Sequence, residues 1–238
     1  MSQAAADRIT PEVAFIGAQM RVLAERYEGV FVTLHHTLKD ELSRSASLSE
    51  GALIAMTIAD AAASALVTHL PNQPTRDCRA GCAACCHLYV MVPPGVVEVI
   101  GDYLTDRLDS EALATLQDSL ERAAAAAQAA PDPSQLRHRC PFLGTDGLCT
   151  IYEVRPPTCR AFTSTSAVAC HSMAFDPEGG VSAIPQNPSQ FRVYVEATTA
   201  LEHSALARGL PSRQTGLAAA VLAALPSSSR THSPNTGA

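Results

Sequence analysis

The ten residues CRAGCAACCH, from Cys78 to His87, contain four of the eight cysteines in this chain of 238 residues. The other four follow after a gap, with the spacing C-x8-C-x9-C-x10-C. They are Cys140, Cys149, Cys159 and Cys170. Thiolates this close together in a sequence form a soft ligand set that suits zinc, iron–sulfur clusters or cuprous copper. The pattern therefore predicts a cysteine-rich metal centre in the middle of the chain.

Composition favours metal ligation over a disulfide framework. A chain of 238 residues that is 47% hydrophobic can bury a core of its own and needs no covalent staples. The first twenty residues lack the basic segment and apolar stretch of a signal peptide, so we expect a cytoplasmic protein in a reducing compartment. In that compartment, clustered thiols indicate metal ligands or redox groups.

Charge and hydropathy exclude two classes of partner. The net charge of −6 provides no basic field for nucleic acid. The longest apolar stretch, from Ala52 to Leu70, is rich in alanine and has Asp60 near its middle, so we expect no membrane span. The cysteine cluster is therefore the strongest evidence that the sequence offers about function.

The N-terminal third of the chain predicts a helical hairpin. Its apolar residues follow the spacing 4-3-4-3-4-3-4, which is typical of a helical seam with a period of 3.5 residues. These residues are Ile9, Val13, Ile16, Met20, Leu23, Tyr27, Val30 and Leu34. The pattern predicts one helix from Pro11 to about Leu42, and the capping box Ser47–Glu50 begins a second that runs to about Leu70. The seam can be covered within the chain or by a second copy in a homodimer, and the sequence favours neither.

Further helices are expected after Pro93-Pro94, over residues 110–130, after the cap at Asn187, and up to about Leu225, with strand-like segments at 88–92 and 149–152. The predicted fold is mainly α, with helical hairpin arms around an irregular cysteine-rich metal-binding centre and at most short strands. We divide the chain into a helical hairpin (1–75), a metal-binding module (76–180), C-terminal helices packing on the rest (181–226) and a disordered tail (227–238).

The groups around the cysteines leave several alternatives open. Neighbouring side chains tend to diverge, so one thiol of the Cys85-Cys86 pair can ligate while the other serves a second centre, bridges or stays free. His87 and His171 each follow a cysteine, and we favour a supporting hydrogen bond or surface exposure over ligation. Six arginines near the thiols either lower thiol pKa values or pair with carboxylates and helix ends. They are Arg76, Arg79, Arg137, Arg139, Arg155 and Arg160.

Five sequence blocks together are similar to a known family. They are Gly81-Cys82-Ala83-Ala84-Cys85-Cys86-His87, Cys140-Pro141-Phe142-Leu143, Gly147-Leu148-Cys149-Thr150-Ile151-Tyr152, Arg155-Pro156 and Cys159-Arg160-Ala161-Phe162. Over residues 76–172 the chain resembles the YkgJ-like cysteine-cluster family, which is named for its CxxCxxCC signature and described as a zinc- or iron-chelating domain. The three residues between Cys78 and Cys82 depart from that signature. The resemblance implies metal binding, and a relative that methylates flagellin lysines has a similar motif that suggests an iron–sulfur cluster.

The leading hypothesis is a metal-binding protein that chelates zinc or iron, including an iron–sulfur cluster as one form of the centre. Its predicted ligands are Cys78, Cys82, Cys85, Cys86, Cys140, Cys149, Cys159 and Cys170. Two alternatives are an iron–sulfur enzyme of group transfer or redox chemistry and a protein of metal trafficking or sensing. The sequence contains no nucleotide-binding loop, metalloprotease motif or nucleophile elbow, so it identifies no catalytic residue.

Overall fold

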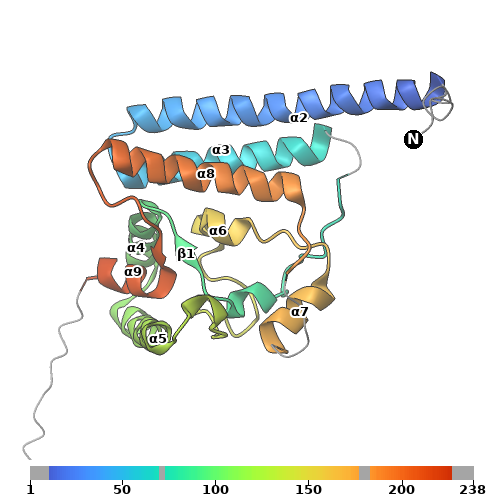
Figure 1. The fold of residues 1–238 in the computed structure, drawn as a ribbon. Coiled ribbons are helices and arrows are strands. Elements are labelled where there is room, and N and C mark those ends of the chain that lie inside the picture. Colours follow the sequence, from blue (N-terminus) through green and yellow to red (C-terminus); the bar gives the residue numbers. More distant parts are fainter. Residues whose placement is uncertain (1–10, 70–72, 177–182, 227–238) are drawn as a thin grey trace, which may run out of the picture.

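The structure is a computed structural model that describes residues 11–69, 73–176 and 183–226, with side chains described from Tyr27 onward. Its helices form two layers (Figure 1). The upper layer contains three long helices in mutual contact, α2 (Pro11–Arg44), α3 (Leu48–His69) and α8 (Pro188–Ala207). The lower layer contains α4 (Val96–Arg107), α5 (Ser110–Ala129) and α9 (Leu217–Ala224), beside the cysteine-rich segments. The prediction of a mainly α fold is therefore confirmed.

The cysteine-rich segments contain short elements only. Three are 3-10 helices, η1 (Ala84–His87), η2 (Pro133–Gln135) and η3 (Tyr152–Val154). The α-helices here are α6 (Pro157–Arg160) and α7 (Ala167–Phe175), neither of which the sequence patterns predicted. The strand expected at 88–92 is reduced to β1 (Met91–Val92), which pairs antiparallel with β2 (Thr215–Gly216). Most of this region is thus held by contacts between loops.

The predicted hairpin of α2 and α3 is present, and local hydrogen bonds explain where α3 begins. The Ser47 hydroxyl accepts a hydrogen bond from the Glu50 amide at 3.1 Å, as a capping box requires. The Glu50 carboxylate accepts from the Ala46 amide at 2.5 Å, one residue before the amide that we expected. The helices approach closely because α3 turns small residues, including Ala52, Ala55 and Ala59, into the core.

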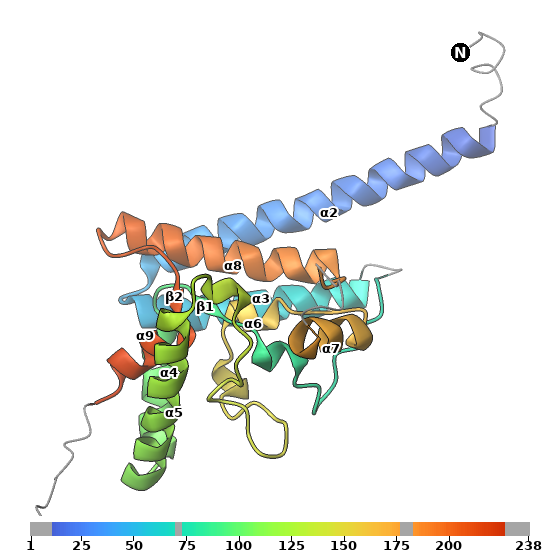
Figure 2. The same cartoon turned by 60° about the horizontal axis from the view of Figure 1, so that its bottom comes forward.

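The second half of the predicted seam is covered within the chain. Its described residues are buried or packed against the core formed with α3 and α8. They are Tyr27, Val30 and Leu34, continued by Leu38 and Leu42. Ile9 and the side chains of Val13, Ile16, Met20 and Leu23 lie outside the described residues. The N-terminal end of α2 extends past the other helices (Figure 2), and the homodimer stays a prediction.

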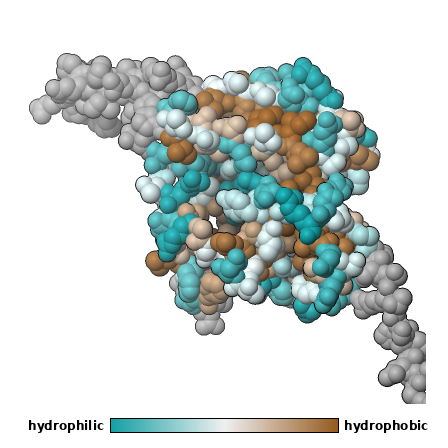
Figure 3. All heavy atoms as spheres, turned by 180° about the vertical axis from the view of Figure 1, so that it is seen from behind, coloured by the Kyte–Doolittle hydropathy of each residue, from teal (hydrophilic) through white to brown (hydrophobic). Residues whose placement is uncertain are grey.

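One described helix, α3, is long and apolar enough to cross a membrane by length and composition alone. A core helix of a folded domain meets the same criteria, and α3 packs against α2, α4 and α8 in this structure. From behind, apolar surface is visible over the upper layer (Figure 3). The exposed large apolar residues of α2 and α3 include Val32, Leu53 and Val67. The described residues leave about half of the surface of each of these three exposed.

The lower layer is the second half of the frame around the cysteines. Helices α5 and α9 contact each other, and α4 contacts both α3 and α9. The Asp109 carboxylate caps α5 by accepting from the Ala112 amide at 2.8 Å, and Asn187 caps α8 through the Gln190 amide at 3.1 Å, as predicted. The four-part division of the chain stays a prediction, and its C-terminal tail lies outside the described residues.

Candidate metal centre

The two cysteine-bearing stretches meet because the chain leaves and re-enters the centre at the same point. The α4–α5 excursion begins after Leu88 and ends at Arg137, and these two residues form an isolated antiparallel bridge. Beside that bridge, the Cys140 amide donates to the Cys86 carbonyl at 2.7 Å and the His138 amide to the His87 carbonyl at 3.0 Å. The predicted bipartite ligand set is therefore joined by backbone hydrogen bonds.

A tight turn separates Cys140 from Cys149. The Gly144 amide donates to the Leu148 carbonyl at 2.7 Å, and Gly147 has a φ of +77°, the left-handed conformation that glycine accepts easily. The expected strand at 149–152 is wrong. Cys149 forms only an isolated bridge with Leu143, and the chain then turns directly into η3. That turn carries the chain back toward the centre, where α6 presents Cys159.

Five thiols from three parts of the chain line one cavity of about 30 Å³. They belong to Cys85, Cys86, Cys140, Cys149 and Cys159. The remaining walls are apolar apart from the guanidinium of Arg155, and include Phe142, Ile151 and Leu217. Both cysteines of the adjacent pair lie in η1 and line this same cavity.

Burial and mutual contact set the protonation of these thiols. Burial raises the pKa of Cys140 and that of Cys159 to about 12. A hydrogen bond between the neighbouring thiols raises the pKa of Cys85 and lowers that of Cys86, with burial raising Cys85 further. Without a metal ion, the cavity therefore favours neutral thiols at Cys85, Cys140 and Cys159.

Arg155 supplies the positive charge beside the thiols. Its Nη2 donates to the Cys159 carbonyl at 2.6 Å and points toward Cys85 Sγ at 4.0 Å. Burial lowers the pKa of Arg155, but the surrounding thiols raise it and prevail. A fixed cation at this distance favours thiolate over thiol and offsets part of the charge of a thiolate–metal centre.

The other three predicted ligands form a second group next to the cavity. Cys78 is exposed, and its Sγ donates to the carbonyls of Phe162 at 3.6 Å and Ser164 at 3.7 Å. Cys170 is buried where α7 packs on η1, and its electrostatic neighbours include Cys78 and Cys82. None of these three lines the cavity. Their placement separates the eight cysteines into groups of five and three.

The donor set fits a thiophilic metal in chemistry and in number. Five thiols exceed the four ligands that zinc or a cubane cluster usually takes, and the guanidinium has the sign that a thiolate centre needs. In the described ranges, no three His, Cys, Asp or Glu side chains are arranged so that they could hold a metal ion. Metal binding would therefore have to draw the cavity thiols together.

The histidines beside the cysteines do not line this cavity. His87 and His171 each contact the ring of Phe175, with centroids 4.7 Å apart in both cases. His87 Nδ1 lies 3.1 Å from the Ala83 carbonyl oxygen. These rings pack at the junction of η1 and α7.

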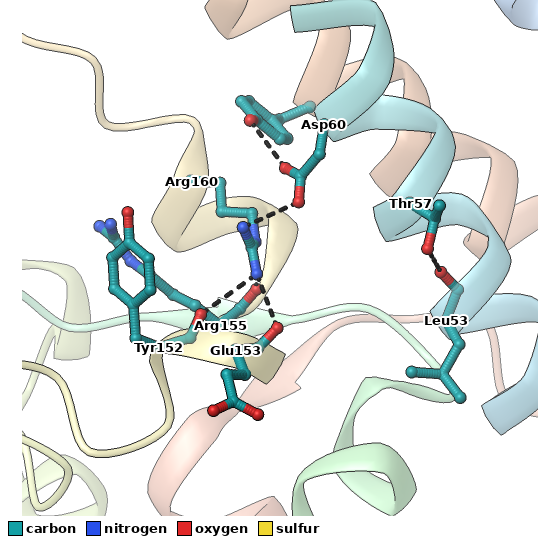
Figure 4. A network of polar contacts seen from close by, with 8 residues as sticks. Leu53, Thr57, Asp60, Tyr152, Glu153, Arg155 and Arg160 are labelled. Atoms are coloured by element: carbon teal, nitrogen blue, oxygen red, sulfur yellow. Dashed lines mark hydrogen bonds and ion pairs between the residues drawn. The ribbon is translucent and has the colours of Figure 1, made fainter. Parts of the chain in front are cut away.

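Sequence reasoning missed the contact that connects this centre to the helical layer. Asp60 of α3 accepts from Arg160 Nη1 at 2.9 Å and from the Tyr194 hydroxyl at 3.0 Å (Figure 4). Two signals were available, an isolated acid in an alanine-rich helix and an arginine directly after a predicted ligand. The other arginines that we singled out include Arg137 and Arg139, which donate to main-chain carbonyls of Met173 and Gly144.

Comparison with known proteins supports the same segment. No curated protein and no solved structure matches the chain. Residues 77–179 match the family model CxxCxxCC, whose description is "Putative zinc- or iron-chelating domain". The match confirms the resemblance that the cysteine blocks predicted, and it contains all eight cysteines. This segment, which is less than half of the chain, is therefore similar to the CxxCxxCC family.

Proposed function

We propose that the protein binds a single zinc or iron ion through the thiols of the five-cysteine cavity. The observation that carries the proposal is that these thiols come from η1, the 140–149 turn and α6, yet line one cavity with Arg155. A metal ion bound there would supply a thiolate-coordinated cross-link between three chain segments. The proposal narrows the eight predicted ligands to Cys85, Cys86, Cys140, Cys149 and Cys159.

The charge of the lining supports a divalent cation. The cavity is narrow, with about 30 Å³ of free space, and Arg155 is the single charged side chain among the described residues that line it. Four thiolates around a divalent cation carry a net charge of about −2, which Arg155 reduces by one unit.

Metal and sulfide analysis of protein purified without oxygen tests this proposal. We expect about one zinc or iron per chain and no acid-labile sulfide, as mononuclear thiolate sites contain none. The double substitution Cys85→Ser/Cys159→Ser should abolish loading, whereas Cys170→Ser, outside the cavity, should retain it. Iron with a matching amount of sulfide would support the cluster instead. Undiminished loading of the double variant would show that the metal binds elsewhere.

A second candidate, metal exchange with other molecules, is favoured by the position of Cys78. This thiol is exposed, and its electrostatic neighbours are Cys85, which lines the cavity, and Cys82. Thiols therefore continue from the surface toward the cavity, as stepwise transfer of a metal requires. The variant Cys78→Ser should load fully but release its metal to a soluble chelator several-fold more slowly than the wild type. Equal release rates would remove the support for exchange.

A further inference from the structure

Arg160 forms hydrogen bonds within the cysteine-bearing segment 152–160 and also joins this segment to the helical layer. Its Nε donates to the Arg155 carbonyl at 2.8 Å, and its Nη2 donates to the carbonyls of Tyr152 at 3.2 Å and Glu153 at 3.0 Å. These carbonyls lie at the end of η3, where helical hydrogen bonding runs out. The remaining nitrogen, Nη1, donates to Asp60 of α3. One side chain thus links η3, the residue after it and a long helix (Figure 4).

Asp60 is itself held from the opposite side. Its Oδ2 accepts from Arg160, and its Oδ1 accepts from the hydroxyl of Tyr194, a buried residue of α8. The Arg160 side chain is 15% exposed and that of Asp60 is 42% exposed, so the guanidinium is shielded while water still reaches the carboxylate and screens part of the attraction. The Asp60 carboxylate therefore connects α3 and α8 of the helical layer to Arg160, which donates to the η3 carbonyls.

The segment that Arg160 holds by hydrogen bonds contributes two side chains to the five-cysteine cavity, those of Arg155 and Cys159. Arg155 belongs to it directly, and Cys159 follows after Pro156-Pro157, whose rings fix their backbone φ angles. Arg155 then reaches back to the Cys159 carbonyl and toward Cys85. A shift of Arg160 would consequently move a thiol and the guanidinium together.

We propose that Asp60 is a positioning residue for the metal centre, which it orients through Arg160 without touching a ligand. The proposal rests on the metal site proposed above and adds that the helical layer sets its affinity. Outer groups that orient metal ligands typically contribute about tenfold to a hundredfold in metal affinity. Asp60 would thus give α3 a functional role besides packing.

A matched ion pair in the same layer distinguishes positioning from general stabilisation. Glu28 of α2 accepts two hydrogen bonds from Arg192 of α8, at 3.1 and 3.2 Å. This pair joins two helices of the upper layer and has no cavity-lining residue. The variant Glu28→Gln therefore removes an interhelical ion pair, more exposed than that of Asp60 and Arg160, while leaving the cysteine segment attached.

The experiment measures zinc affinity, by competition with a chromophoric chelator, and the absorption spectrum of the cobalt(II)-loaded full chain. We expect Asp60→Asn to weaken zinc binding about tenfold and to shift the cobalt bands, because Cys159 and Arg155 are displaced. Asp60→Glu should recover part of both, and Glu28→Gln should change neither. Tyr194→Phe, which keeps the ion pair and loses one hydrogen bond, should weaken binding by a smaller factor of about three.

Wild-type affinity and an unchanged cobalt spectrum in Asp60→Asn would overturn the proposal. So would an equal loss of affinity in Asp60→Asn and Glu28→Gln, because the effect would then be general. If Asp60→Asn fails to fold, Tyr194→Phe decides, and a zinc affinity equal to that of the wild type counts against positioning. Failure of the wild type to bind zinc or iron would instead reject the metal site itself.

Discussion

The helical layer and the five-cysteine cavity are stabilised in different ways although they are in contact. The layer consists of helices of 34, 22 and 20 residues around a core of fully buried leucine and alanine side chains. The cavity is framed by helices of only four residues, η1 and α6, and by scattered loop hydrogen bonds. Burial of apolar surface is sufficient to stabilise the helical layer. The cavity is instead lined by thiols, and burial raises the pKa of Cys140 and Cys159 so that these two stay neutral.

This difference indicates where the free energy of folding comes from in each region. Long amphipathic helices bury enough apolar area to offset the entropy of ordering them. Short loops gain little by burial and depend on cross-links, which here a bound metal would supply. The two regions should therefore respond separately to loss of metal and to loss of core volume.

Removal of the metal should produce the largest effect, and confine it to the cysteine-rich region. In chelator-treated, reduced protein, the amides of 84–88 and 138–161 should lose about ten-thousandfold of their hydrogen-exchange protection, because structural metal contributes several kcal/mol to folding. Amides in the second half of α2, in α3 and in α8 should keep theirs. Hydrogen exchange by mass spectrometry measures both regions at once.

Reloading the same sample with zinc is the control, and it should restore protection. Uniform loss over α3 and α8 would show that the layers fold as one unit. Unchanged protection at the cysteines in verified metal-free protein would show that the loops stand without a metal.

A cavity in the helical core should produce the converse result. Leu38 is fully buried, so Leu38→Ala should lower the free energy of unfolding by about 2–5 kcal/mol. Metal stoichiometry should remain that of the wild type, because Leu38 is not among the residues that line the five-cysteine cavity. Urea unfolding and metal analysis check the two parts. Val32→Ala on the same helix, where Val32 is 47% exposed, should cost less than about 0.5 kcal/mol.

The two regions also differ in how far their sequences predict them. The spacing of Leu34 with its neighbours, and the caps at Ser47 and Asn187, predicted α2 and α3 to within about two residues and the start of α8, because helix periodicity and capping are local. The cysteine blocks predicted the family segment for the same reason. The grouping of five thiols around one cavity depends on the bridge between Leu88 and Arg137. These two residues are separated in the sequence by α4 and α5, so local patterns do not predict their contact.

Residues that act between the regions were beyond local patterns. In the sequence, Asp60 is only an acid that interrupts an apolar helix. Its partner Arg160 is 100 residues away in the sequence, and only the folded structure brings the two side chains together. The strand expected at 149–152 failed because alternating apolar residues there are followed by the turn into η3. In both cases the structure or role of the residue depends on a tertiary contact that local sequence patterns do not show.

pH should affect metal-free and metal-loaded protein in opposite directions. The thiols of Cys140 and Cys159 have pKa values of about 12 when folded, whereas unfolded cysteine titrates near 8.5. Between these values the unfolded chain holds fewer protons, so stability of the metal-free protein falls as pH rises. From pH 8.5 to 9.5 the loss should be about 1 kcal/mol for each thiol, or about 2 kcal/mol together.

Zinc affinity should instead rise with pH, because binding displaces protons from the thiols. Urea unfolding of the metal-free protein and competition titrations at pH 7.0, 8.5 and 9.5 measure the two trends. Serine at both positions, which does not titrate in this range, should flatten the stability trend. A metal-free protein whose stability is level over that interval would contradict the raised pKa values.

Two glycine substitutions should have the smallest effect on stability and compare the two regions directly. Gly147, in the turn between Cys140 and Cys149, and Gly209, at the end of α8, have positive φ angles of 77° and 69°. An added Cβ would meet only ordinary contacts at Gly147 and nothing within 4 Å at Gly209, so the cost of alanine is backbone strain in both. Each substitution should lower the free energy of unfolding by about 1 kcal/mol.

Their effects on metal binding should nevertheless differ. Gly147→Ala changes the turn that sets the distance between two cavity thiols, so it should weaken zinc binding several-fold in a competition titration. Gly209→Ala changes only the close of a helix in the upper layer, where the Gly209 amide donates to the Leu206 carbonyl at 3.0 Å, and zinc affinity should not change. If both variants lose affinity alike, strain anywhere in the fold reaches the centre, and the two regions are not separable. If neither does, the turn between Cys140 and Cys149 is flexible enough to absorb the strain, and the metal alone determines how the thiols are spaced.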